Sequence, residues 1–157
     1  MLTFIPAAAL FDACAGGDAT AVSRLLPAGG TVVNLSGARF QRARDKDTPL
    51  MQAAWRGHTS IVRMILERAP NTSVDHADLS RGTALIMAAQ FNHADIVRLL
   101  VDCGAIVDTR GLRGATSLRE AVVGSRGDPD PDGARQVATV RALLRLDAST
   151  LPPGPQP

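Results

Sequence analysis

Aromatic side chains are scarce in this sequence. They make up 3% of its 157 residues, with one Trp, four Phe and no Tyr. A core with so few rings has to be filled by Ala, Leu, Val and Ile, which suits thin helices that pack closely. Lysine occurs once, and 17 basic against 15 acidic residues give a net charge of only +2. A charge this small does not by itself indicate a nucleic-acid partner, and we expect none.

Cysteine is also sparse, and its two copies have no metal-binding spacing and form no CxxC motif. Cys14 and Cys103 both fall in segments that we predict to be helical. We therefore expect free, buried thiols in a reducing compartment, the cytoplasm, rather than a disulfide.

Long hydrophobic runs are absent as well. No apolar stretch approaches the ~20 residues that a membrane-spanning helix needs, so we expect no membrane partner. Residues 1–15 are apolar and end in Ala-Cys-Ala, as some secretory signal peptides do. This segment has no basic beginning and contains Asp12. It also fits a structural repeat, and that is the interpretation we favour.

The sequence does contain an internal repeat, a unit that occurs twice. Residues 48–66 and 83–101 share their pattern, and Leu50 corresponds to Leu85, which gives a period of 35 residues. A chain that repeats near this period buries its core by stacking neighbouring units rather than by closing one globule. Function is then expected on a surface rather than in a pocket.

Each unit predicts two helices joined by a turn. Thr48 can cap the first helix, in which Pro49 takes the first position at no cost in hydrogen bonds. Gly57 permits the left-handed backbone that ends this helix. The second helix then has apolar residues at i, i+1, i+4 and i+5, which form an inward face. These residues are Ile61, Val62, Ile65 and Leu66, and in the other copy Ile96, Val97, Leu100 and Val101.

The opening Thr-Pro-Leu, the Ala-Ala pair, Gly57-His58, Ile61-Val62 and the later Gly104-Ala105 together resemble ankyrin repeats. The resemblance implies an all-α solenoid of helix-turn-helix units with short β-turn fingers. It is strongest over residues 43–108 and weaker in the flanks. We expect one domain over residues 1–149, followed by a Pro-rich flexible tail at 150–157. Its four approximate repeats are 7–34, 44–75, 79–108 and 112–148, with insertions near 34–47 and 126–133.

The histidines offer little chemistry under this interpretation. The resemblance implies that His58 and His93 bridge backbone groups of neighbouring repeats, which is a structural role, and His76 is expected in a solvated loop. No Ser-His-Asp or Cys-His set remains visible. Alternating Asp128, Asp130 and Asp132 are reminiscent of a calcium loop, but intervening prolines and a missing Glu favour a solvated loop. We expect no catalytic residue, no metal and no cofactor.

The resemblance implies binding through the concave face, built from the first helix of each repeat and the fingers. The expected face residues are Met51, Gln52, Trp55, Arg56, Ile86, Met87, Gln90, Phe91 and Arg119. The chain's one Trp, Trp55, is not needed for the core of its own repeat, and exposed Trp and Arg are enriched at binding hot spots. The alternative is that Trp55 packs over the preceding loop or against Phe91.

The expected fingers are rich in arginine and could line up as one basic edge. Their basic residues are Arg39, Arg42, Arg44, Lys46, Arg81, Arg110 and Arg113. Such an edge would favour an acidic partner. The alternative is a mixed, solvated rim, since Asp45, Asp47, Asp78 and Asp108 lie among them. Lys46 and Arg81 also depart from the family, which often has Gly there, so the shape of these turns is open.

We therefore predict a non-catalytic module that binds another protein through the concave face and fingers. Two other classes stay open. One is an enzyme on a repurposed repeat scaffold, for which Asp12, Glu120 or His93 would have to supply acid or base chemistry in a pocket. The other is a binder of an anionic ligand or a nucleic acid through the finger arginines. Apolar end repeats also leave a homodimer open.

Overall fold

All regular structure in the described part of the chain is helical. The computed structural model describes residues 7–26, 47–69, 72–78, 82–111, 114–124 and 133–150. The helices in these residues are α1 (Ala7–Gly16), α2 (Ala19–Leu25), α3 (Pro49–Arg56), α4 (Thr59–Arg68), α5 (Ala84–Gln90), α6 (Ala94–Asp102), α7 (Ser117–Val123) and α8 (Ala134–Thr150). This confirms the predicted all-α class.

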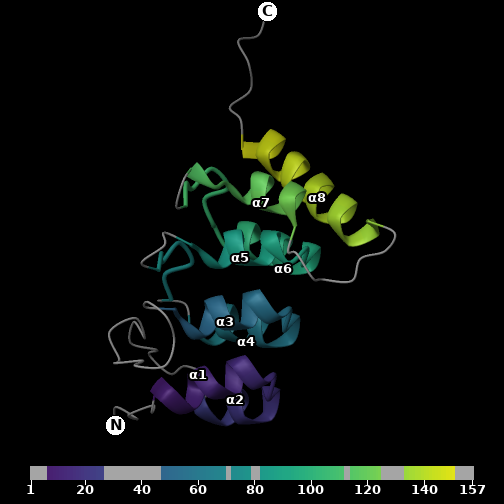
Figure 1. Cartoon of the computed structure of the whole chain (residues 1–157). Helices are drawn as coiled ribbons and strands as arrows, with labels where there is room; N and C mark the ends of the chain where they lie inside the picture. The colour runs from purple at the N-terminus through teal and green to yellow at the C-terminus, as the bar shows by residue number, and fades with distance from the viewer. Residues whose placement is uncertain are drawn as a thin grey trace, which may run out of the picture.

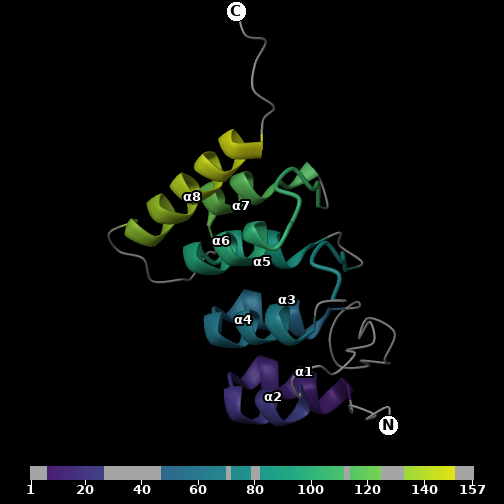
Figure 2. The ribbon, with the colours of Figure 1, turned by 180° about the vertical axis from the view of Figure 1, so that it is seen from behind.

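The helices form four antiparallel pairs that stack in chain order (Figure 1). The first helices of the pairs, α1, α3, α5 and α7, contact one another in sequence along one side of the stack. The second helices, α2, α4, α6 and α8, form the other row. The view from behind shows the same order, with α1 and α2 at one end and α7 and α8 at the other (Figure 2). Each pair therefore contacts only its neighbours, as in a solenoid.

The helix boundaries follow from local chemistry. Thr48 caps α3 by accepting a hydrogen bond from the backbone N–H of Met51 at 3.2 Å. Thr83 and Thr116 cap α5 and α7 in the same way. Gly57 ends α3 in the left-handed region with φ 78°. The predicted Thr cap and Gly stop are thus confirmed in the second repeat.

Neighbouring repeats meet at the turns between their two helices. The ring of His58 lies against Gly17, and the ring of His93 lies against Gly57, each histidine belonging to the following repeat. In the third repeat the position equivalent to Gly57 is Asn92, which adopts φ 57° and is buried. A side chain is tolerated there because short polar residues such as Asn visit the left-handed region more readily than others.

The core is a continuous stripe of small and aliphatic side chains between the two rows. In the two middle second helices the buried core residues are Ile61, Val62 and Ile65 of α4 and Ile96, Val97 and Leu100 of α6. Leu66 and Val101, the last members of the predicted inward faces, are only half-buried against this core. They lie where the second helices turn toward solvent.

Three expectations need correction. Cys103 is exposed and follows α6 as its cap, whereas Cys14 is buried inside α1; both are free. His76 lies in a loop, as expected, but it is half-buried rather than fully solvated, and its buried Nε2 has no hydrogen-bond partner among the described residues. The last helix continues to Thr150, so the expected tail loses its first residue to α8.

Candidate functional site

Four side chains from two neighbouring repeats meet where the first helices end. The guanidinium carbon of Arg56 lies 5.0 Å from the ring centroid of Trp55. The rings of Trp55 and Phe91 meet edge to face, with centroids 5.8 Å apart and planes inclined by 68°. Phe91 stacks on His93 at 6.4 Å and 15°. We call this group, Arg56, Trp55, Phe91 and His93, the aromatic ladder.

The repeat period explains why these residues meet. Trp55 and Arg56 are the last two residues of α3, and Phe91 caps the end of α5 one repeat later. Since α3 and α5 pack side by side, their ends come together. His93 fixes the register between them, because its Nε2 lies 3.1 Å from the carbonyl oxygen of Trp55. One neutral ring N–H can donate this bond, which holds the backbone beneath the indole in place.

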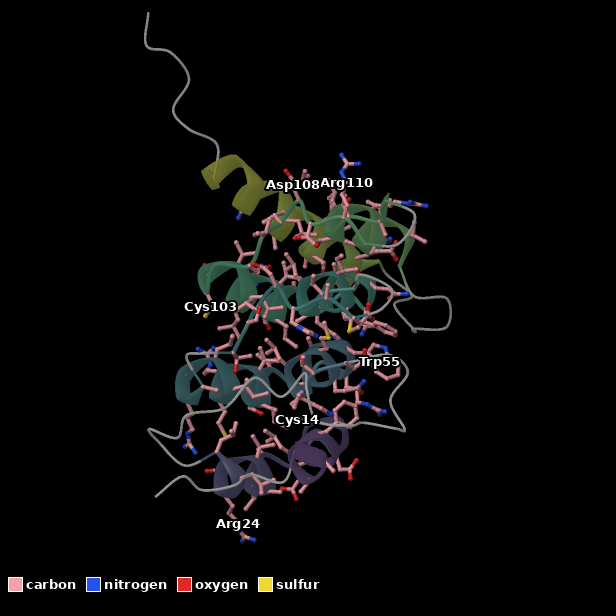
Figure 3. The ribbon with its side chains drawn as sticks, turned by 90° about the vertical axis from the view of Figure 1, so that its left-hand side faces the viewer. Cys14, Arg24, Trp55, Cys103, Asp108 and Arg110 are labelled. Atoms are coloured by element: carbon pink, nitrogen blue, oxygen red, sulfur yellow. The ribbon has the colours of Figure 1, made fainter. Side chains whose placement is uncertain are left out.

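The side chains of the aromatic ladder pack against one another and are also accessible to solvent. Trp55 is 38% exposed, Arg56 is exposed, and Phe91 and the adjacent Gln90 are half-buried. In the side view of the stack, Trp55 and Cys103 lie on opposite sides of the molecule (Figure 3). Trp55 does contact Phe91, as the alternative interpretation of this residue predicted. More than a third of the surface of Trp55 is nevertheless exposed to solvent.

Three residues of the predicted binding face were expected to be exposed and are instead buried. Met51, Gln52 and Ile86 are 1%, 5% and 6% exposed. The sulfur of Met51 accepts the backbone N–H of Thr48 at 3.3 Å, and Gln52 donates to the carboxylate of Asp47 at 2.8 Å. The physical reason is that the first turns of α3 and α5 face the neighbouring first helices, which pack directly against them.

The remaining predicted face residues lie closer to the surface. Arg119 of α7 is exposed, and Met87 of α5 is half-buried against the core. Arg119 is two repeats away from Trp55 along the row of first helices, so the structure does not bring it into the ladder. Of the predicted face residues, the described contacts unite only Trp55, Arg56 and Phe91.

Most of the predicted finger residues fall outside the described part of the chain. These are Arg39, Arg42, Arg44, Lys46, Arg81 and Arg113. The bases of two fingers are described: Asp78 N–H donates to the carbonyl of Gly82 at 3.0 Å, and Gly111 N–H to that of Ala115 at 2.7 Å. Asp108 and Arg110 are both exposed between α6 and α7 (Figure 3).

The residues considered for catalysis line neither of two cavities in the described part of the chain. An almost closed cavity of about 20 Å³ lies between α1, α3 and the segment after α4, with His76 in its wall. An open groove lies along α7 and α8. Neither is lined by Asp12, Glu120 or His93. Asp128, Asp130 and Asp132 lie outside the described residues, and within those residues no three metal-ligating side chains gather.

The buried thiol of Cys14 is not a nucleophile. Burial raises its pKa to about 12, because the thiolate would lose its hydration inside α1. The side chain is therefore a neutral, packed thiol at neutral pH.

In the part of the chain that the structure describes, no helix has both the length and the apolar character to span a bilayer.

One surface was missed by sequence reasoning. The apolar residues of the last helix do not all face the core: Leu143 is fully buried, Val140 is half-buried and Leu144 is 52% exposed. The signal that could have revealed this is the spacing of Val137, Val140 and Leu144, which is a second helical stripe beside the one that faces the core.

Comparisons with known proteins agree with this architecture. The sequence matches the ankyrin repeat family at residues 45–79 and 82–112, which hold the second and third helix pairs. It is similar to human ankyrin repeat and KH domain-containing protein 1, with 35% identity over 108 residues, 69% of this chain and 4% of that protein. It is also similar to human ankyrin repeat domain-containing protein 17, with 36% identity over 75 residues, 48% of this chain and 3% of that protein.

Mouse ankyrin repeat and SAM domain-containing protein 6 is similar too, with 34% identity over 104 residues, 66% of this chain and 11% of that protein. The chain thus spans 11% or less of the length of these three relatives. What they share with it is the repeat unit, seen here as stacked helix pairs. The chain therefore belongs to the ankyrin repeat family, whose repeats generally serve as protein–protein interaction modules.

Proposed function

We propose that the chain binds another protein through the face formed by α1, α3, α5 and α7, with the aromatic ladder at the centre of the contact. One observation carries the proposal: Trp55 is held from both sides, by Arg56 and Phe91, and still exposes 38% of its surface. Binding hot spots are enriched in Trp, Tyr and Arg. A side chain that is ordered before binding loses little conformational entropy in the complex.

The fingers extend this surface in one direction. They precede α3 and α5, whereas the ladder lies at the opposite ends of these helices. Helix α3 has eight residues and is therefore about 12 Å long. A partner that touches both the ladder and Arg44, Lys46, Arg81 or Arg113 has to span that length, which a standard interface of about 800 Å² per partner allows.

An acidic partner fits the exposed arginines best. Arg56 and Arg110 are exposed, and the finger positions add further positive charge by sequence. Opposite charges at the rim of an interface mainly speed association. The association rate should therefore fall as salt rises, while the dissociation rate changes little. A salt-independent association rate would contradict the acidic character of the partner.

Site-specific cross-linking tests the proposal while the partner is still unidentified. A photoreactive phenylalanine replaces Trp55 in one variant and Ser60, exposed on α4 in the other helix row, in a matched control. In a lysate of the source organism, one protein should cross-link from position 55 and not from position 60. Cross-links that form equally from both positions would contradict the proposed face.

The captured protein then allows a quantitative test. With both proteins purified, Trp55→Ala should weaken binding by about 30-fold, the loss typical of a hot spot. Ser60→Ala should bind like the unchanged chain. A Trp55→Ala variant that is folded and binds with unchanged affinity would sink the proposal.

We further propose that this interaction takes place in the cytoplasm. The support is that both Cys14 and Cys103 are free, with Cys103 exposed to any oxidant. Exposed free thiols persist in reducing compartments. Fractionation of source cells, with thiol alkylation before lysis, should find the chain in the cytosolic fraction with Cys103 reduced. Recovery from a secreted fraction, or with Cys103 oxidised, would contradict this location.

A further inference from the structure

The C-terminal end of the helix stack carries an apolar groove of about 680 Å³ that no described helix covers. Its floor consists of Val122 of α7 and of Val137, Val140 and Leu144 of α8. Gln136, Arg141 and Arg145 complete its walls. Its residues belong to α7 and α8, the last helix pair, which lies at the C-terminal end of the stack (Figure 1), whereas the aromatic ladder comes from the second and third pairs. We call it the end groove.

The two ends of the stack differ in kind. At the C-terminal end Val122, Val123, Val137 and Leu144 are each more than half exposed. Among the described residues of α1 and α2 no large hydrophobic side chain is exposed. The outermost repeat of a solenoid normally presents a polar face to water. Within the described residues the contiguous apolar patch lies at one end, and such a patch marks a surface that another molecule covers.

The shape of the end groove fits a helix. Val137, Val140 and Leu144 recur at i, i+3 and i+7 on α8, so they form one straight stripe. Val122 of α7 lines the groove beside this stripe. An amphipathic helix that lies between α7 and α8 would insert its own apolar stripe, spaced in the same way, into this channel.

The positive charge of the end groove determines which kind of helix it would bind best. Arg141 and Arg145 are exposed, lie one helical turn apart along the groove, and form no ion pair with any described residue. Among the residues whose side chains the structure describes, no acidic one lines the groove. In a symmetric dimer the same patch faces itself, so two copies would bring these four positive charges into one contact. A second copy of the chain is therefore disfavoured, and a negatively charged occupant is favoured.

We propose that the end groove binds an amphipathic helix of a partner protein whose apolar stripe is flanked by Asp or Glu. The apolar residues of that helix pack on Val122, Val137 and Leu144. Two of its carboxylates, four residues apart, pair with Arg141 and Arg145. The proposal is independent of the aromatic ladder, since the two surfaces share no residue.

A pair of designed peptides tests this proposal on the full chain. Both have about 14 residues, or four helical turns, with Leu at the a and d positions of the heptad. One carries Glu and the other Lys at the c and g positions, which lie four residues apart on one side of the apolar stripe. Fluorescence anisotropy of the labelled peptides should show at least ~10-fold tighter binding of the Glu peptide.

Variants of the groove make the result specific. Leu144→Asp should abolish binding of the Glu peptide, and the double variant Arg141→Glu with Arg145→Glu should reverse the preference toward the Lys peptide. Arg63→Glu, an exposed position on α4, is the matched control and should change neither. Trp55→Ala should leave peptide binding intact even if it weakens the partner proposed above. Circular dichroism checks that each variant is folded, which is expected because the altered side chains are exposed.

Three outcomes would overturn the proposal. The first is that neither peptide binds the full chain at up to about 1 mM, the weak limit of specific recognition. The second is equal binding of both peptides with no response to the Arg141 and Arg145 reversal. The third is a stable dimer in sedimentation that Leu144→Asp dissociates, which would make a second copy the occupant.

Discussion

A Cβ atom on Gly17 would lie 2.8 Å from Cε1 of the His58 ring. The glycine belongs to the first repeat and the histidine to the second, so this contact joins two units of the stack. Gly17 also has φ 76°, a conformation that side chains disfavour. Its neighbour Gly16 has no atom within 4 Å of the corresponding position. The two adjacent glycines are therefore a matched pair.

Gly17→Ala should lower the free energy of unfolding by about 1–3 kcal/mol, because the new methyl group is strained and meets the imidazole. Gly16→Ala, at the end of α1, should leave stability unchanged or raise it by up to about 1 kcal/mol. Urea titration followed by circular dichroism measures both. Equal effects of the two substitutions would show that the contact with His58 has no energetic weight.

Much of this fold could be predicted from the sequence because the unit repeats. Thr48 and Gly57 mark the ends of a helix by hydrogen bonding and backbone freedom, which are local properties. The all-α class and the pairing of helices then follow. The position of Cys103 could not be predicted so well, since helix ends shift by a residue or two and the exposure of a terminal residue shifts with them.

The rings of Trp55 and Phe91 should be energetically coupled. A double-mutant cycle of Trp55→Ala and Phe91→Ala should give a coupling energy of about 0.5–1.5 kcal/mol, the value for edge-to-face pairs. Unfolding measured by circular dichroism supplies the four stabilities. Trp55 is the one Trp of the chain, so its fluorescence also reports directly on the loss of Phe91.

Val123 provides the control for this cycle. It is exposed on α7, which α5 separates from α3. Trp55→Ala and Val123→Ala should be additive within about 0.5 kcal/mol, as expected of distant sites. If Trp55 were as strongly coupled to Val123 as to Phe91, the direct ring contact would not explain the energy.

Leu100 and Leu66 occupy similar positions in the repeat pattern and differ in burial. Leu100 is fully buried, whereas Leu66 is half-buried. Leu100→Ala should cost about 2–5 kcal/mol through lost packing and the cavity that remains. Leu66→Ala should cost less than about 2 kcal/mol, since water already reaches part of this side chain. Chemical denaturation of the two variants decides the order, and the reverse order would show that the repeat relaxes around Leu100.

Stability should fall in alkaline solution because of Cys14. Burial raises the pKa of its thiol to about 12 in the folded chain, above the ordinary value near 9. Below pH 9 the thiol is protonated in both states and its contribution is complete. As pH rises from 9 toward 12 the unfolded chain ionises first, so stability falls by up to about 1.4 kcal/mol per pH unit.

The comparison of two cysteine variants isolates this effect. Cys14→Ala should flatten the alkaline slope of stability, whereas Cys103→Ser, at an exposed position, should keep it. With no Tyr and one Lys in the chain, few other groups titrate in this range. The quantity to compare is the slope between pH 8 and 10, because Cys14→Ala also changes packing. An unchanged slope in Cys14→Ala would assign the alkaline loss to other groups.

The candidate site was harder to predict than the fold. Sequence reasoning singled out Trp55 and Phe91 because the repeat does not require large rings there. It could not tell that Met51 and Ile86 are buried, since their exposure depends on how closely the next first helix approaches. The end groove was hidden for the same reason: whether Leu144 faces the core or water depends on the angle at which α8 crosses α6.

The adjacent positions of Gly57 and His58 have a consequence for how a chain of this kind can gain further repeats in evolution. His58 covers the glycine of the preceding unit, and Gly57 is covered by the histidine of the following one. A single unit thus carries, at adjacent positions, the glycine that the following unit contacts and the histidine that contacts the preceding unit. If the gene segment for residues 44–78 were duplicated in tandem, the new His58 would meet the old Gly57 in a joint of the existing kind. A unit added at this point would then need no compensating substitution in the contact between its glycine and its histidine.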